Sequence, residues 1–153
     1  MFTIDEETGM TGAKELEGAN FSGKILLNLD TEDDDELSIG CAGGIDTNTS
    51  FNYQEVELKE GYECMEVTIR GLLGGHSGMD IHLGRGNANK LLNRFLYHIH
   101  SLGDFQLVSF DGGSLRNAIP RESIANVIIA EMYDEAFVFD MQEVIGDIKT
   151  EFK

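Results

Sequence analysis

The chain has 153 residues and a formal net charge of −17, because 28 Asp and Glu outnumber 11 Lys and Arg. This balance argues against a nucleic-acid or anionic-membrane partner, since both are bound chiefly through Lys and Arg. Hydrophobic residues make up 41% of the chain and charged residues 25%, which is typical of a globular protein and excludes wholesale disorder.

No apolar run approaches the roughly 18 residues that a membrane-spanning helix needs. The first residues, MFTIDEE, are acidic where a signal peptide would be basic. We therefore expect a cytoplasmic protein. Cys41 and Cys64 form no CxxC pair, which favours buried, reduced thiols over a disulfide framework or a zinc ribbon.

The first 50 residues have the pattern of an α/β sheet. Residues 2–4 and 37–41 are typical of short strands, and residues 12–16 suggest a short helix. Residues 23–30 form an apolar run that ends on a carboxylate, which predicts a buried strand. The polar stretch at 46–50 then indicates a domain boundary.

After the boundary the elements are predicted by their periodicity. Residues 55–70 alternate as a strand with a bend at Gly61, and residues 105–110 and 124–130 alternate as two further strands. From about residue 134 the apolar spacing fits an amphipathic helix. Another helix is predicted by a one-sided apolar stripe of Ala88, Leu91, Leu92, Phe95, Leu96 and Ile99.

The order strand, helix, strand, strand, helix predicts an α+β fold of the split βαβ type that lacks its last strand. The chain enters a strand pattern at once and ends before that last strand. We therefore expect an internal piece of a larger protein.

An acidic run invites a calcium-loop interpretation, because Asp30, Glu32, Asp34 and Glu36 occupy alternate positions. An EF-hand loop would need a bidentate Glu at its twelfth position, where this sequence has Cys41. The run is therefore better explained as a solvated acidic loop.

Carboxylates follow two of the predicted strands, where open α/β sheets place their ligands. Glu6 and Glu7 come after the strand at 2–4, and Asp30 ends the strand at 23–30. One of two adjacent glutamates can bind a metal while the other takes a proton. Alternatively, the two glutamates lie at the start of a helix, where its dipole favours them, and Asp30 is only a turn residue.

Two later loops also carry candidate residues. His76 lies in the glycine-rich stretch GLLGGHSG, where its imidazole could donate to an oxyanion, whereas His82 is better explained as a structural histidine. Arg116 could bind a carboxylate and Asn117 could add an amide donor. A surface turn with salt bridges is the alternative for this second loop.

These clusters together resemble the two-zinc amino- and carboxypeptidase family, and within it the aminoacyl-histidine (Xaa-His) dipeptidases. The resemblance runs nearly from end to end. Its motifs, in chain order, are TIDEETGMTGA, LDTE with GCAGG, GGHSG with GRGNANKL, and RNAIPRE.

The resemblance implies that Glu6 is the general base and Glu7 a zinc ligand, while Asp30 binds the other zinc. It implies that His76, on a lid domain, reaches the active site of a neighbouring subunit and polarises the scissile carbonyl. Asn117 would contact the substrate, with Arg116 beside it. The implied reaction is hydrolysis of a dipeptide by a metal-activated water.

The resemblance further implies two zinc ions in the intact enzyme, although such ligands also accept cobalt or manganese. Residues 1–50 would belong to an α/β catalytic domain, and residues 51–153 to a lid and dimerisation domain with an antiparallel sheet and two helices. We expect a dipeptide substrate, a homodimer formed through the lid, and neither nucleic acid nor membrane as a partner.

The sequence departs from the family because the upstream His-x-Asp motif, the bridging aspartate and the distant histidine are absent. We therefore expect this fragment to bind zinc poorly and to be inactive alone. The alternative function is a non-catalytic acidic binding or dimerisation module derived from such a lid.

Overall fold

A computed structural model describes residues 2–7, 9–30, 34–41, 43–58, 60–103, 105–130 and 135–152 of the chain. They divide into two compact units, Met1–Phe51 and Asn52–Lys153. Among the described residues, no helix combines the length and apolar character that crossing a membrane requires.

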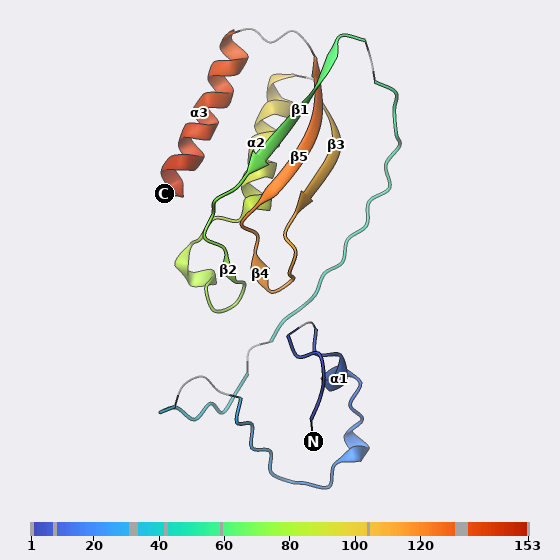
Figure 1. Cartoon of the computed structure of the whole chain (residues 1–153), viewed down its shortest axis with the longest axis vertical. Helices are drawn as coiled ribbons and strands as arrows, with labels where there is room; N and C mark the ends of the chain where they lie inside the picture. The colour runs from blue at the N-terminus through green and yellow to red at the C-terminus, as the bar shows by residue number, and fades with distance from the viewer. Residues whose placement is uncertain are drawn as a thin grey trace. The chain divides into compact units, whose positions relative to one another are not determined.

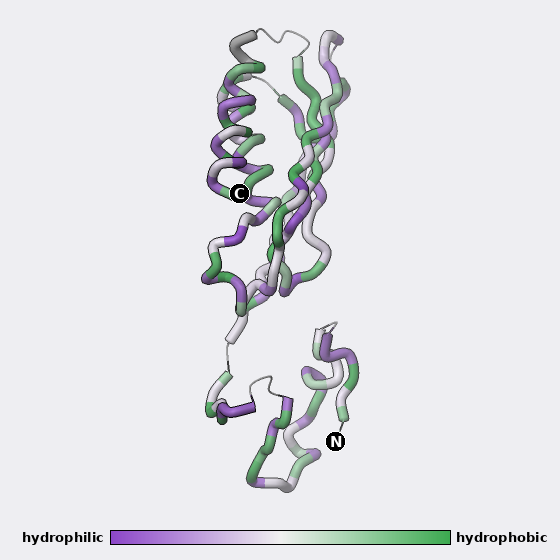
Figure 2. The backbone as a smooth tube through the Cα atoms, turned by 60° about the vertical axis from the view of Figure 1, so that its left-hand side comes forward, coloured by the Kyte–Doolittle hydropathy of each residue, from purple (hydrophilic) through white to green (hydrophobic). Residues whose placement is uncertain are grey.

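The second unit contains a three-stranded antiparallel sheet in the order β1-β5-β3 (Figure 1). Two helices lie on one side of this sheet, so that the unit has two layers (Figure 2). The elements are β1 (Tyr62–Ile69), α2 (Ala88–Leu102), β3 (Phe105–Gly112), β5 (Ser123–Ala130) and α3 (Glu135–Glu151). The predicted α+β order is confirmed, and the expected helix start near 134 lies outside the described residues.

The core forms where the apolar stripe of α2 meets the sheet. Leu92 is fully buried and Ile99 is 1% exposed, and both pack with Val127 of the central strand. Burying each such side chain stabilises the fold by about 1.5–3 kcal/mol. The N-cap of this helix is Asn87, whose side chain accepts a 3.2 Å hydrogen bond from the Lys90 backbone N–H.

A small second sheet joins two loops of this unit. β2 (Gly75–His76) pairs antiparallel with β4 (Ala118–Ile119), with Gly75 opposite Ile119 and His76 opposite Ala118. This sheet was not predicted, because strands of two residues carry no periodicity. The strand expected over residues 55–70 is shorter than predicted, since the described residues 52–58 form no strand and β1 begins only after the turn at Gly61.

The first unit contains only α1 (Thr11–Lys14) and η1 (Gly18–Asn20) among its described residues. The short helix was predicted, but the strands expected at 2–4, 23–30 and 37–41 are not formed. The expected burial is also wrong, since Leu26 is 90% exposed. The physical reason is that a strand needs hydrogen-bonded neighbours, which the described part of this unit does not supply.

The two cysteines also differ from expectation. Cys41 and Cys64 are free, as predicted, but both are exposed and not buried. Cys64 lies on β1 opposite Ile128, where its side chain points away from the helices, on the same face as Glu66. The acidic run is exposed at Asp34 and Glu36, whereas Glu32 lies outside the described residues.

Candidate active site

His76 has a defined imidazole orientation although its side chain is exposed. Its Nδ1 accepts hydrogen bonds from the backbone N–H groups of Gly78 and Met79, both at 3.1 Å. Because a nitrogen that accepts cannot carry the proton, the neutral ring has its proton on Nε2. The Nε2–H is therefore a donor held in place by its own loop.

The backbone around His76 is fixed by an ion pair. Asp80 Oδ2 accepts a 2.8 Å hydrogen bond from the His76 N–H and lies 3.2 Å from Arg85 Nη1. The same Nη1 donates to the Gly74 carbonyl at 2.8 Å. A glycine is needed at 75, because its φ is +147° and an added Cβ would lie 2.6 Å from Asp80 Oδ2.

The β2–β4 pairing brings the second predicted loop to His76. The backbone N–H of Ser77 donates to the Asn117 carbonyl at 2.8 Å, next to the pairing of His76 with Ala118. Arg116 and Asn117 are both exposed. Three of the predicted site residues therefore lie on adjoining turns of one unit.

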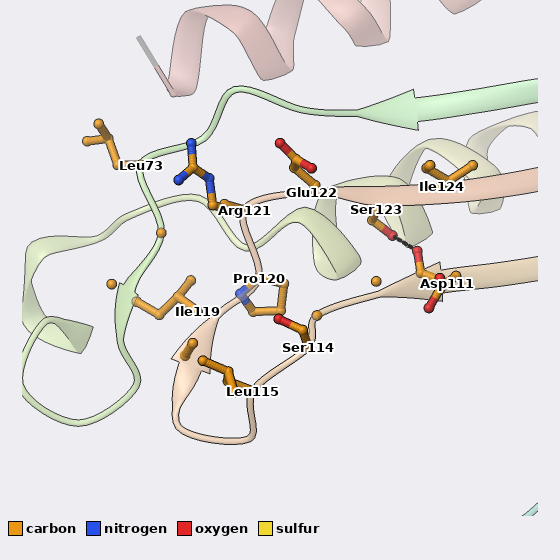
Figure 3. A pocket seen from close by; sticks show the side chains of 15 residues that line it. Leu73, Asp111, Ser114, Leu115, Ile119, Pro120, Arg121, Glu122, Ser123 and Ile124 are labelled. Carbon is orange, nitrogen blue, oxygen red and sulfur yellow. Dashed lines mark hydrogen bonds between the residues drawn. The ribbon is translucent and has the colours of Figure 1, made fainter. Parts of the chain in front are cut away.

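A groove of about 850 Å³ is lined on one side by residues 73–75, which lead into β2 (Figure 3). Its other lining residues lie in the connection from the end of β3 to the start of β5, which includes β4. Its charged lining residues are Asp111, Arg121 and Glu122. Buried Ser123, at the start of β5, donates from its Oγ to the Asp111 carbonyl at 3.1 Å. This bond joins the two strands at the edge of the groove.

Two residues in the first turn of α2 bind the backbone of the connection between β3 and β5. Asn89 Nδ2 donates to the Gly112 carbonyl at 3.1 Å, and the Ala88 N–H donates to the Pro120 carbonyl at 2.8 Å. The sequence analysis gave no role to Asp80, Arg85 or Asn89. A signal for Arg85 and Asn89 was the motif GRGNANKL, which places an arginine just before the helix predicted from the stripe of Ala88 to Ile99 and an asparagine in its first turn.

The remaining candidates lie in the first unit. Glu6 and Glu7 are exposed in a turn whose Asp5 carbonyl accepts from the backbone N–H groups of Gly9 and Met10. α1 begins after Met10 with no acidic residue in its first turn, so the helix-start explanation of these glutamates is not supported. Asp30 is exposed, and its backbone N–H donates to Asn28 Oδ1 at 3.0 Å.

These carboxylates do not complete a metal site by themselves. Among the residues that the structure describes, no three His, Cys, Asp or Glu side chains gather in a way that could hold a metal ion. Carboxylates are suitable zinc ligands, but a zinc site takes three or four protein ligands. Glu7 and Asp30 can each supply only one.

The clearest electrostatic interaction lies away from His76. Arg94 of α2 and Glu151 of α3 form an exposed ion pair with an Nη1–Oε2 distance of 2.7 Å. The hydrogen bond from Arg94 lowers the pKa of Glu151, and the bond to Glu151 raises the pKa of Arg94. This pair connects the two helices.

Comparison with known proteins gives three findings. Residues 67–153 match the model of the M20 peptidase dimerisation domain. The cytosol non-specific dipeptidase of Escherichia coli (strain K12) is 47% identical over 131 residues, which are 85% of this chain and 27% of that protein. The crystal structure of aminoacylhistidine dipeptidase from Vibrio alginolyticus matches with a TM-score of 0.73 and 41% identity, covering 97% of this chain and 30% of that one. The chain thus spans less than a third of either relative.

Proposed function

This chain belongs to the family of the M20 peptidase dimerisation domain, and we propose from that premise that it is part of a metal-dependent cytoplasmic dipeptidase that hydrolyses Xaa-His dipeptides. Residues 1–50 would be part of the catalytic domain and residues 51–153 most of the lid. The observation that carries the proposal is the fixed, exposed Nε2–H of His76 beside Asn117. It is supported by relatives whose names describe dipeptidases.

His76 donates its Nε2–H to the oxygen of the scissile carbonyl. A donor that is already oriented stabilises the negative charge that develops there without reorganising during the reaction. Asn117 contacts the substrate from the adjoining turn, and Arg116 binds a carboxylate of the dipeptide. These three residues account for binding and polarisation of the peptide bond.

Glu6 takes a proton from the attacking water and passes it to the leaving amine. Glu7 and Asp30 would each give one carboxylate to a different zinc ion, and the other ligands would come from parts of the longer protein outside these 153 residues. Zinc, when bound, supplies a Lewis acid at the peptide bond.

The partner of this chain is a second copy, and edge strand β3 is the contact surface. At this edge Leu107 is 53% exposed, Val108 58% and Phe110 39%. The other edge, β1, instead exposes Glu63 and Glu66, whose like charges would repel a second copy. An apolar edge with unpaired backbone groups favours strand addition.

The test is release of free histidine from glycyl-histidine with added zinc by the longer protein that carries this sequence. Glu6→Gln keeps the shape of the side chain but removes its basic carboxylate, so kcat should fall by roughly 10²- to 10⁴-fold. Glu17→Gln, a change of an exposed glutamate in the same unit, is the matched control and should leave kcat unaltered. Full activity of Glu6→Gln would overturn the assignment.

A further inference from the structure

We propose that Arg85 and Asp80 are positioning residues that hold the His76 imidazole with its Nε2–H directed outward. The inference rests on the proposed function of His76 and adds the residues through which its loop is oriented. Neither residue needs to touch the substrate, because Asp80 binds the His76 backbone N–H and Arg85 binds Asp80 and the Gly74 carbonyl.

The ion pair fixes the chain on both sides of Gly75. Arg85 Nη1 holds the Gly74 carbonyl at 2.8 Å, and Asp80 Oδ2 holds the His76 N–H at 2.8 Å. The two side chains are only 28% and 29% exposed, and they contact each other at 3.2 Å. Removing either partner leaves one of these backbone groups without its hydrogen bond.

The turn after His76 completes the arrangement. The Asp80 N–H donates to the His76 carbonyl at 3.0 Å, so Asp80 binds the backbone of His76 through two groups. That closure places the N–H groups of Gly78 and Met79 on Nδ1. If the turn opens, Nδ1 loses both donors and the proton is free to exchange between the two ring nitrogens.

Arg85 also connects the loop to a rigid element. It lies two residues before Asn87, the N-cap of α2, and α2 is anchored in the core by Leu92. The orientation of His76 is therefore set by the helix and not by the exposed loop alone. Precise placement of a donor on a rigid element is what catalysis requires, because small displacements are costly.

The Arg94–Glu151 pair supplies a matched control. It is also an arginine–carboxylate contact in this unit, but its side chains are 43% and 46% exposed and it bonds no part of the His76 loop. An exposed pair of this kind contributes little to stability. Arg94→Gln therefore makes the same chemical change as Arg85→Gln without affecting His76.

The first experiment is nitrogen NMR of the His76 imidazole in the 153-residue chain. In the unmodified chain and in Arg94→Gln, the two ring nitrogens should have the widely separated resonances of a single tautomer. In Arg85→Gln and Asp80→Ala, these resonances should move toward each other as the tautomers exchange. Unchanged resonances in both of these variants would overturn the proposal.

The second experiment is steady-state hydrolysis of glycyl-histidine by the longer protein. Arg85→Gln should lower kcat by roughly 10- to 100-fold with little change in KM. Arg85→Lys, which retains a cation for Asp80, should recover most of the loss, and Arg94→Gln should match the unmodified protein. An unaltered kcat in Arg85→Gln would overturn the positioning role. A His76→Ala variant with full activity would overturn the proposed function of His76, while the resonances would still decide what orients the ring.

Discussion

At the scale of single residues, Gly75 allows the loop to close over the ion pair. Its φ of +147° is one that side chains rarely adopt, and an added Cβ would lie 2.6 Å from Asp80 Oδ2. We predict that Gly75→Ala lowers the free energy of unfolding by about 1–3 kcal/mol. Denaturant titration of the 153-residue chain measures this change.

Gly146 in α3 is the matched control for that substitution. An added Cβ at Gly146 meets nothing within 4 Å, and alanine is the better helix former. Gly146→Ala should therefore raise the free energy of unfolding by about 0.5–1 kcal/mol. If Gly75→Ala and Gly146→Ala changed the free energy of unfolding in the same direction, the close approach at Gly75 would not explain the effect of Gly75→Ala.

The contribution of the Arg94–Glu151 pair to folding stability should depend on pH. Because the hydrogen bond from Arg94 lowers the pKa of Glu151 in the folded chain, the pair stabilises the fold above the usual glutamate pKa of about 4.3. Its contribution is lost as the pH falls through the lowered, folded pKa. Glu151→Gln should therefore lower the melting temperature slightly at neutral pH and have no effect in stronger acid.

Glu143→Gln on the same helix controls for the loss of a negative charge. Glu143 is exposed, so its substitution should leave the melting temperature nearly constant across the same pH range. High salt should reduce the difference caused by Glu151→Gln, since exposed charges are screened. An effect of Glu151→Gln that grew in acid would contradict the assigned ion pair.

Only some of the residues at this site could be predicted from the sequence. His76 and Asn117 could be predicted as candidates because His76 lies in a glycine-rich loop and Asn117 in a loop that contains proline. Asp80 and Arg85 were not singled out, although Arg85 lies in the GRGNANKL motif, because each gains its role only through contacts across the loop. The roles of the predicted site residues stay predictions.

At the scale of elements, the long periodic segments of the second unit and the short helix α1 were predictable, whereas the two-residue strands β2 and β4 were not. The stripe of α2 and the alternation of β5 follow from burial of one face, which the sequence records directly. β2 and β4 have two residues each and form only because the His76 loop and the Asn117 loop meet. The strands expected in the first unit need neighbours that its described residues do not provide.

We predict that the chain forms a dimer through the edge strand β3. Light scattering of the 153-residue chain should give the mass of a dimer. Val108→Lys should shift it to a monomer, because a charge on an exposed edge strand disfavours pairing with another chain. Thr68→Lys adds the same charge at an exposed position of β1, and this variant should remain dimeric. A dimeric Val108→Lys would contradict the assigned surface.

At the scale of the whole molecule, the family assignment and the α+β order agree with the sequence analysis. The ordered motifs made this possible, since they combine residue type, spacing and position relative to predicted strands. The metal-binding arrangement could not be derived in the same way. The proposed site would need ligands beyond Glu7 and Asp30, and the described residues contain no group of three His, Cys, Asp or Glu that could hold a metal ion.

The role proposed for His76 is donation of its Nε2–H during hydrolysis of a dipeptide. The most direct test is the rate of histidine release from glycyl-histidine by the zinc-loaded longer protein with His76→Ala, compared with His82→Ala. We predict that His76→Ala lowers kcat by roughly 10²- to 10³-fold, the cost of losing one oxyanion donor. The control changes another exposed histidine of the same unit and should retain full activity. Equal activity of the two variants would contradict the claim.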